Sequence, residues 1–138
     1  MSPTIPATLR DWVIERDHSR CAYCRSPESM SISAFEVDHI VPRHSGGHTE
    51  QNNLCYCCPS CNRFKATRQR AVDPETGDQV PLFHPRTQTW SDHFQFDEGN
   101  AVLEGRTPTG RATIAALHMN RPSLVQLRRL WRKLGIAP

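Results

Sequence analysis

The sequence lacks any long apolar run. No stretch of its 138 residues approaches the ~18 consecutive apolar residues of a membrane-spanning helix, which excludes a helical membrane protein. The first 20 residues contain neither the apolar core nor the small-residue cleavage site of a secretory signal peptide. We therefore expect a cytoplasmic protein, with no membrane partner.

Hydrophobic residues are also scarce. They make up 37% of the chain, aromatic residues make up only 7%, and the mean hydropathy is −0.60. A chain of this length can form one compact domain with a modest core, and two large domains are excluded. Because the core is thin, we expect an additional source of stability, and we predict that it is a bound metal ion.

Cysteine, in contrast, occurs six times. In a reducing compartment cysteines are more often metal ligands or free thiols than disulfides. Two C-x2-C pairs are present, and each forms a turn whose two thiolates can reach one ion. They predict a structural zinc site without an open coordination position, made of Cys21, Cys24, Cys58 and Cys61.

Cys55 leaves a second pairing open, because Cys55 and Cys58 also stand in C-x2-C spacing. We favour Cys58 with Cys61, since Pro59 then lies inside the turn and begins the following helix. In that case Cys55 and Cys57 are ordinary small buried residues.

Acidic residues are missing from two segments, 63–70 and 121–138, although the net charge of the chain is only +3. Basic segments without acids predict contact with a polyanion. The candidate contact residues are Arg63, Lys65, Arg128, Arg129 and Arg132, and a solvated helix face is the alternative for Arg63 and Lys65.

The periodicity of the chain predicts an α+β fold. We expect a strand or short hairpin at 31–41, a β-hairpin at 93–105, and loops at 43–54 and 73–86. Helices are predicted at 6–17, 59–70, 107–118 and 122–134. In the last helix an apolar stripe is predicted to pack in the core, formed by Leu124, Leu127, Trp131 and Leu134.

A series of short motifs occupies residues 21–65. Between the two cysteine pairs lie VDHIVP at 37–42, the pair Gly46–Gly47, and Asn53 with Leu54; Asn62 and Lys65 follow the second pair. In this order and spacing the segment resembles the HNH endonuclease family. The resemblance implies a small ββα-metal core, which we place with its zinc site at residues 1–70. Residues 71–138 form a C-terminal extension with a hairpin and two helices, which we expect to pack on the core.

The resemblance also implies the roles of individual residues. His39 is the expected general base, because a neutral imidazole accepts a proton from water near neutral pH. Asp38 and Asn62 are the expected ligands of a catalytic cation, and Asn53 is expected to tie the loop to the strand and hold His39. Oxygen ligands favour Mg²⁺ or Mn²⁺. Glu36 is expected on the same face as Asp38, either in a surface ion pair or as a third ligand.

Three functions are compatible with these features. The leading prediction is a metal-dependent DNA endonuclease or nickase with little sequence preference, because Arg and Lys contacts to the backbone give affinity without reading bases. The alternative is a catalytically inactive, zinc-stabilised nucleic-acid-binding module. A third hypothesis is a zinc domain for protein interaction that has no nucleic-acid partner.

Overall fold

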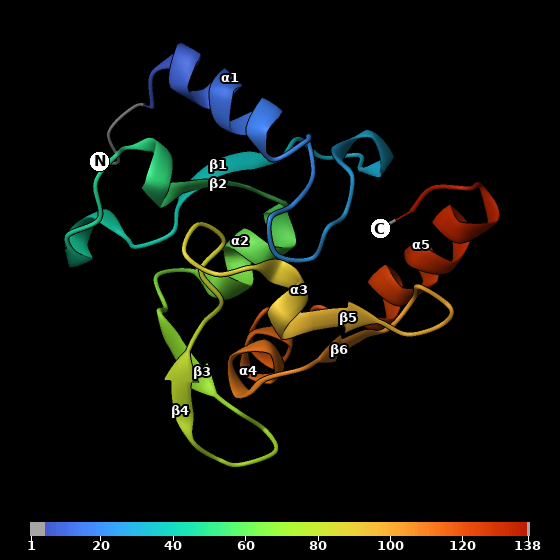
Figure 1. Ribbon diagram of the computed structural model, residues 1–138. Helices are drawn as coiled ribbons and strands as arrows, with labels where there is room; N and C mark the ends of the chain where they lie inside the picture. Colours follow the sequence, from blue (N-terminus) through green and yellow to red (C-terminus); the bar gives the residue numbers. More distant parts are fainter. Residues whose placement is uncertain (1–4, 138) are drawn as a thin grey trace. The chain divides into compact units, whose positions relative to one another are not determined.

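The computed structural model describes residues 5–137, which fall into two compact units, one ending at Asn62 and the other beginning at Arg63. The described residues form five α-helices and short, two-stranded sheets (Figure 1). The α+β class predicted from the sequence is therefore confirmed. None of the helices in residues 5–137 has the length and apolar character needed to span a lipid bilayer.

The first unit is built on one antiparallel hairpin. Strand β1 (Glu36–His39) pairs with β2 (Leu54–Cys57), so that Glu36 lies opposite Cys57 and His39 opposite Leu54. Helix α2 (Pro59–Lys65) follows β2 almost at once and gives the order strand, strand, helix (Figure 1). Short 3-10 turns occupy Glu28–Met30, Arg43–Ser45 and Gln51–Asn53.

Helix α1 (Ala7–Arg16) is fixed to this hairpin mainly by polar contacts. Of its residues, Val13 is buried. Arg16 donates hydrogen bonds to the carbonyl oxygens of Gln51, at 2.6 Å, and of Leu54. The carboxylate of Asp17 accepts from the backbone N–H of Tyr56 at 2.8 Å. The end of α1 therefore fixes the start and middle of β2.

The hydrophobic core of this unit is small, as its composition predicts. Phe35 and Tyr56 pack with their ring centroids 5.6 Å apart, and the Tyr56 hydroxyl donates to Glu28 at 2.6 Å. The remaining apolar core side chains, apart from cysteines, are Val13, Tyr23, Val37, Ile40 and Leu54. An apolar core of this size contributes little to stability, so a bound metal ion can contribute a large part of it.

The second unit contains two hairpins and three helices. Strand β3 (Arg70–Val72) pairs with β4 (Gln79–Pro81), and β5 (Phe94–Phe96) pairs with β6 (Leu103–Gly105). The helices are α3 (Trp90–His93), α4 (Pro108–Ala116) and α5 (Pro122–Lys133). The hydroxyl of Thr107 caps α4 by accepting from the N–H of Gly110 at 3.0 Å.

An ion pair joins α4 to the β3–β4 hairpin. Arg111 donates to both carboxylate oxygens of Asp73, at 3.0 and 2.9 Å. Asp73 also accepts from the N–H of Glu75 and the hydroxyl of Thr76, both at 3.0 Å, and so orders the turn that connects β3 to β4. Arg111 is the first cause of the lowered pKa of Asp73, which is about 2.

Most predicted elements are confirmed, but one helix is shorter than predicted and one predicted loop contains a strand. The hairpin at 93–105 and the helices at 6–17, 107–118 and 122–134 correspond to β5–β6, α1, α4 and α5. The helix predicted over 59–70 ends at Lys65, because Ala66 adopts a left-handed conformation with φ of 49°. The loop predicted at 73–86 contains β4, which pairs with β3.

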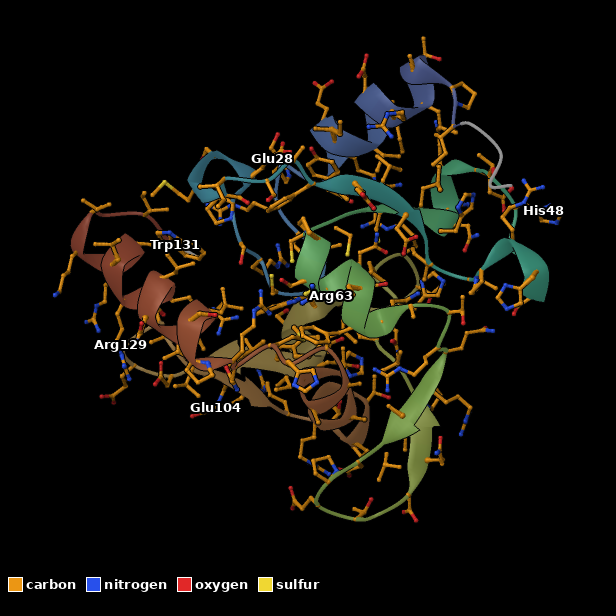
Figure 2. All side chains as sticks on the ribbon, turned by 180° about the vertical axis from the view of Figure 1, so that it is seen from behind. Glu28, His48, Arg63, Glu104, Arg129 and Trp131 are labelled. Carbon is orange, nitrogen blue, oxygen red and sulfur yellow. The ribbon has the colours of Figure 1, made fainter. Side chains whose placement is uncertain are left out.

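The apolar stripe of α5 is only partly buried. Leu124 and Trp131 are each 3% exposed, as predicted, whereas Leu127 and Leu134 are 42% and 59% exposed. Arg128, one residue from Leu127, is 1% exposed instead. Figure 2 shows Trp131 and its exposed neighbour Arg129 on α5.

Candidate active site and metal centre

Four cysteine sulfurs converge in the first unit. Cys21 and Cys24 lie in the turn after α1, Cys58 directly precedes α2, and Cys61 lies in its first turn. All four residues are buried, and their sulfur atoms lie within 4.8 Å of one another. The sulfurs of Cys24 and Cys58 are 3.7 Å apart. A zinc tetrahedron with bonds of about 2.3 Å has edges of about 3.8 Å, so the donor set fits Zn²⁺.

The electrostatics of the cluster favour a cation. Burial is the main cause of the raised pKa of Cys21. Hydrogen bonds from Cys21, Cys58 and Cys61 hold the pKa of Cys24 well below its usual value. Three thiols around one thiolate can exist in a dry pocket, but further thiolates there require a compensating positive charge. A divalent cation supplies that charge and allows all four sulfurs to ionise.

The other two cysteines lie on β2 outside this group. Cys55 and Cys57 are completely buried, as predicted for small core residues. A hydrogen bond with Cys21 lowers the pKa of Cys57, but burial and the nearby Cys55 outweigh it and raise the value to about 11. The group that converges contains Cys61 and leaves Cys55 out, which is the pairing favoured from the position of Pro59.

His39 ends β1 and is oriented by the following loop. Its Nε2 atom lies 2.8 Å from the hydroxyl oxygen of Thr49, which also accepts a hydrogen bond from Arg43 at 3.0 Å. Burial is the main cause of the lowered pKa of His39, with Arg43 acting in the same direction and Asp38 against it. Burial and Arg43 therefore favour the neutral form of the imidazole, whose Nε2 is engaged by Thr49.

Asn53 connects the loop to the end of β1. Its side-chain oxygen accepts from the N–H of Val41 at 2.8 Å, and its Nδ2 donates to the carbonyls of Val41 and His48 at 3.0 and 2.9 Å. Asn53 is 7% exposed. Gly47 passes so close that a Cβ there would lie 1.8 Å from the Val41 oxygen. Only glycine allows this approach, which brings Thr49 back to His39.

Asn62 lies on α2 and reaches β1. Its Nδ2 donates to the carboxylate of Glu36 at 2.6 Å. Glu36 and Asp38 are two residues apart on β1 and share one face of the strand. Because the NH₂ group of the Asn62 side chain donates to Glu36, its amide oxygen points away from Glu36. Asp38 is half-buried, and its negative charge contributes to the raised pKa values of Tyr23 and Cys57.

The predicted nucleic-acid contacts are only partly at the surface. Arg63, Arg129 and Arg132 are exposed (Arg63 and Arg129 are labelled in Figure 2). Lys65 and Arg128 are 2% and 1% exposed, so their burial contradicts the prediction that they contact a nucleic acid. Arg128 is buried because it hydrogen-bonds and packs inside the second unit, as described below.

Sequence reasoning missed two residues of this site and one contact. Thr49 contacts His39, and Arg43 contacts Thr49. The missed contact is the hydrogen bond of Glu36 with the amide of Asn62. The alternation of β1 indicated that Glu36 shares the face of Asp38. Nothing local in the loop distinguishes Thr49 from the neighbouring polar residues, because its contact depends on how the loop folds back.

The comparison with family models agrees with this geometry. Residues 21–68 match the model described as HNH endonuclease. This segment is therefore an HNH domain, and the resemblance drawn from residues 21–65 is confirmed.

Two curated proteins are similar to the chain. One is the Septu protein PtuB of Bacillus thuringiensis, 26% identical over 110 residues, which cover 78% of this chain and 39% of PtuB. The other is the CRISPR-associated endonuclease Cas9 of Corynebacterium diphtheriae, 42% identical over 60 residues, which cover 43% of this chain and 5% of Cas9. The chain thus spans well under half of either relative. No solved structure matches it. The family match and the similarity to an endonuclease support a nuclease, and the four-cysteine cluster supports metal binding.

Proposed function

We propose that this chain is a metal-dependent endonuclease that hydrolyses DNA phosphodiester bonds. The observation that carries the proposal is the position of the His39 imidazole, which follows a half-buried carboxylate, Asp38, on β1 and is oriented by Thr49. Burial lowers the pKa of His39, which favours the neutral form that can accept a proton. This arrangement favours the endonuclease over the inactive binding module.

In the proposed reaction His39 acts as the general base. With Nε2 engaged by Thr49, Nδ1 accepts a proton from a water molecule, and the water oxygen attacks phosphorus. The phosphorus–oxygen bond to the leaving sugar then breaks, and the departing oxygen takes up a proton from solvent. Asn53 holds the loop that carries Thr49, so it positions the base without touching the reacting atoms.

Asp38 and Asn62 are the residues that would hold the catalytic cation. A carboxylate and an amide oxygen are hard donors that suit Mg²⁺ or Mn²⁺. The bond from Asn62 to Glu36 supports this assignment, because it leaves the amide oxygen as the free donor. When bound, such a cation stabilises negative charge on the phosphate and the leaving oxygen. The four-cysteine centre would hold Zn²⁺ for structure alone.

A nucleic-acid substrate is consistent with the charges of the chain. The segments 63–70 and 121–138 carry cations and no acids, and Arg63 is exposed on the helix that carries Asn62. Contacts of this kind bind the phosphate backbone and confer little sequence preference.

The proposal is tested by cleavage of supercoiled plasmid in Mg²⁺, in Mn²⁺ and without added metal. Wild-type protein should convert plasmid to open-circle or linear forms only with metal. Asp38→Ala and Asn62→Ala should lose most activity, because each removes an oxygen donor. Arg10→Gln, an exposed change on α1, is the matched control and should cleave normally. Metal-independent cleavage, or full activity of Asp38→Ala, would remove the proposed cation site.

A further inference from the structure

The second unit contains a basic cleft beside α5. It has a volume of about 590 Å³ and is lined by Asp97, Gly99, Ala101, Arg129, Arg132 and Lys133. Three cations therefore face one carboxylate. We call this feature the α5 cleft.

Arg128 does not line the α5 cleft but anchors α5 beside it. Its Nη1 donates to the carbonyl of Ala101 at 3.0 Å and to the side-chain oxygen of Asn120 at 3.2 Å. Its guanidinium also lies 5.2 Å from the centre of the Phe96 ring. These contacts fix α5 against the turn between β5 and β6. The buried arginine thus acts as an anchor and is not a surface cation.

The turn opposite α5 is itself ordered. Asp97 accepts hydrogen bonds through Oδ1 from the N–H groups of Ala101 and Val102, at 3.0 and 3.1 Å. These bonds are the main causes of its lowered pKa, and Arg129 contributes as well. The single carboxylate of the cleft is thus held by its own backbone, and its one negative charge offsets only part of the three positive charges.

The three cations stand on one face of α5. Arg132 and Lys133 follow Arg129 by three and four positions, so all three are neighbours across one helical turn of about 5.4 Å. All three are exposed. Within residues 5–137 none of them makes a hydrogen bond or an ion pair of 4 Å or less with a carboxylate. Arg132 passes over Gly99, where a Cβ would come within 3.4 Å of its Nη1.

We propose that the α5 cleft binds backbone phosphates of a nucleic acid through Arg129, Arg132 and Lys133, as a docking site on the second unit distinct from the proposed catalytic residues. The inference rests on the proposed function for the identity of the polyanion. Cations spread over a helical turn at an open surface suit a row of phosphates along a strand. A free phosphate is the competing source of the same chemistry.

The test measures DNA affinity against salt concentration by fluorescence anisotropy, using the full chain with His39→Ala so that substrate is not consumed. The cleft variant carries Arg129→Gln, Arg132→Gln and Lys133→Gln. The matched control carries Arg10→Gln, Arg20→Gln and Arg106→Gln, three cations that lie outside the cleft and outside both acid-free segments and that remove the same charge; Arg10 and Arg106 are exposed, and Arg20 is half-buried. Circular dichroism verifies that both variants keep the fold.

The cleft variant should lower the slope of log affinity against log salt by about 2.7, since each phosphate contact contributes about 0.9 on B-DNA. The control should retain nearly the parent slope. Equal losses in the two variants would mean that only net charge matters and would overturn the inference. A parallel calorimetric titration with inorganic pyrophosphate tests whether the cleft binds a free phosphate compound instead of a nucleic acid. Cleft-dependent pyrophosphate binding without an effect on DNA would also overturn it.

Failure of the docking site and failure of the proposed nuclease activity can be distinguished. If wild type cuts plasmid but the cleft variant keeps the parent slope, the docking site is wrong and the nuclease proposal stands. If wild type never cuts but the slope falls selectively in the cleft variant, the docking site stands and the nuclease proposal fails.

Discussion

Replacing Cys61 with serine removes one of the four sulfurs that converge in the first unit. The side chain of Cys61 is fully buried, so the serine hydroxyl cannot be compensated by solvent. A hydroxyl is a much poorer zinc ligand than a thiolate, because it does not ionise near neutral pH. We expect Cys61→Ser to bind zinc weakly and the first unit to lose its fold.

The magnitude follows from the size of the unit. Structural zinc contributes about 10–16 kcal/mol in small zinc-dependent domains, or roughly 2.5–4 kcal/mol for each of four ligands. A unit that ends at Asn62 and has few apolar core side chains gains only about 3–5 kcal/mol from its core. Loss of one ligand therefore removes a free energy comparable with the contribution of the whole apolar core.

The assay combines elemental analysis of zinc with thermal unfolding, with and without a chelator. Wild type should contain one zinc per chain and lose its unfolding transition in the chelator. Cys55→Ser is the control, because Cys55 is equally buried but outside the converging group. It should keep its zinc. The reasoning is refuted if Cys61→Ser keeps its zinc and melting temperature, or if Cys55→Ser releases the metal.

Other parts of the structure give three further predictions. Asn53→Ala removes three hydrogen bonds and should cost about 2–4 kcal/mol in chemical denaturation; unchanged stability would contradict its role. Thr49→Val should lower kcat about 10-fold or more through misorientation of His39, with Thr49→Ser near wild type; equal rates in both variants would exclude this. Asp73, with a pKa of about 2, stabilises the fold above its unfolded pKa, and this contribution disappears as pH falls toward 2. Arg111→Met should therefore shift acid unfolding, followed by circular dichroism, to higher pH, and an unshifted transition would oppose it.

The metal centre could be predicted because its information is local. Each C-x2-C pair forms a turn by itself, and the position of Pro59 at the start of α2 separates Cys58–Cys61 from the alternative pairing. The motif order around His39 likewise indicated the HNH segment, which the family model matches over residues 21–68. The hairpin β5–β6 and helices α4 and α5 followed from their periodicity.

The failures share one physical cause, which is contact between residues distant in sequence. Residues 73–86 look like a loop because the segment is rich in turn-forming residues and contains three prolines, but Arg111 and the side chain of Asp73 stabilise a hairpin there. Arg128 looks like a surface cation on an amphipathic helix, yet the carbonyl of Ala101 and the ring of Phe96 bury it. The periodicity of a helix predicts which of its residues share a face, but it does not predict which residues of other elements will contact that face.

The central claim is that His39 is the base of a hydrolytic reaction. The most direct test measures single-turnover cleavage of DNA in Mg²⁺ by wild type and His39→Ala, together with the DNA affinity of each protein. We predict that His39→Ala cleaves at least about 10²-fold more slowly while its affinity is unchanged, since a general base contributes about 10²–10⁴-fold to the rate. Cleavage at the wild-type rate by His39→Ala, or no cleavage by either protein despite equal DNA binding, would contradict the account.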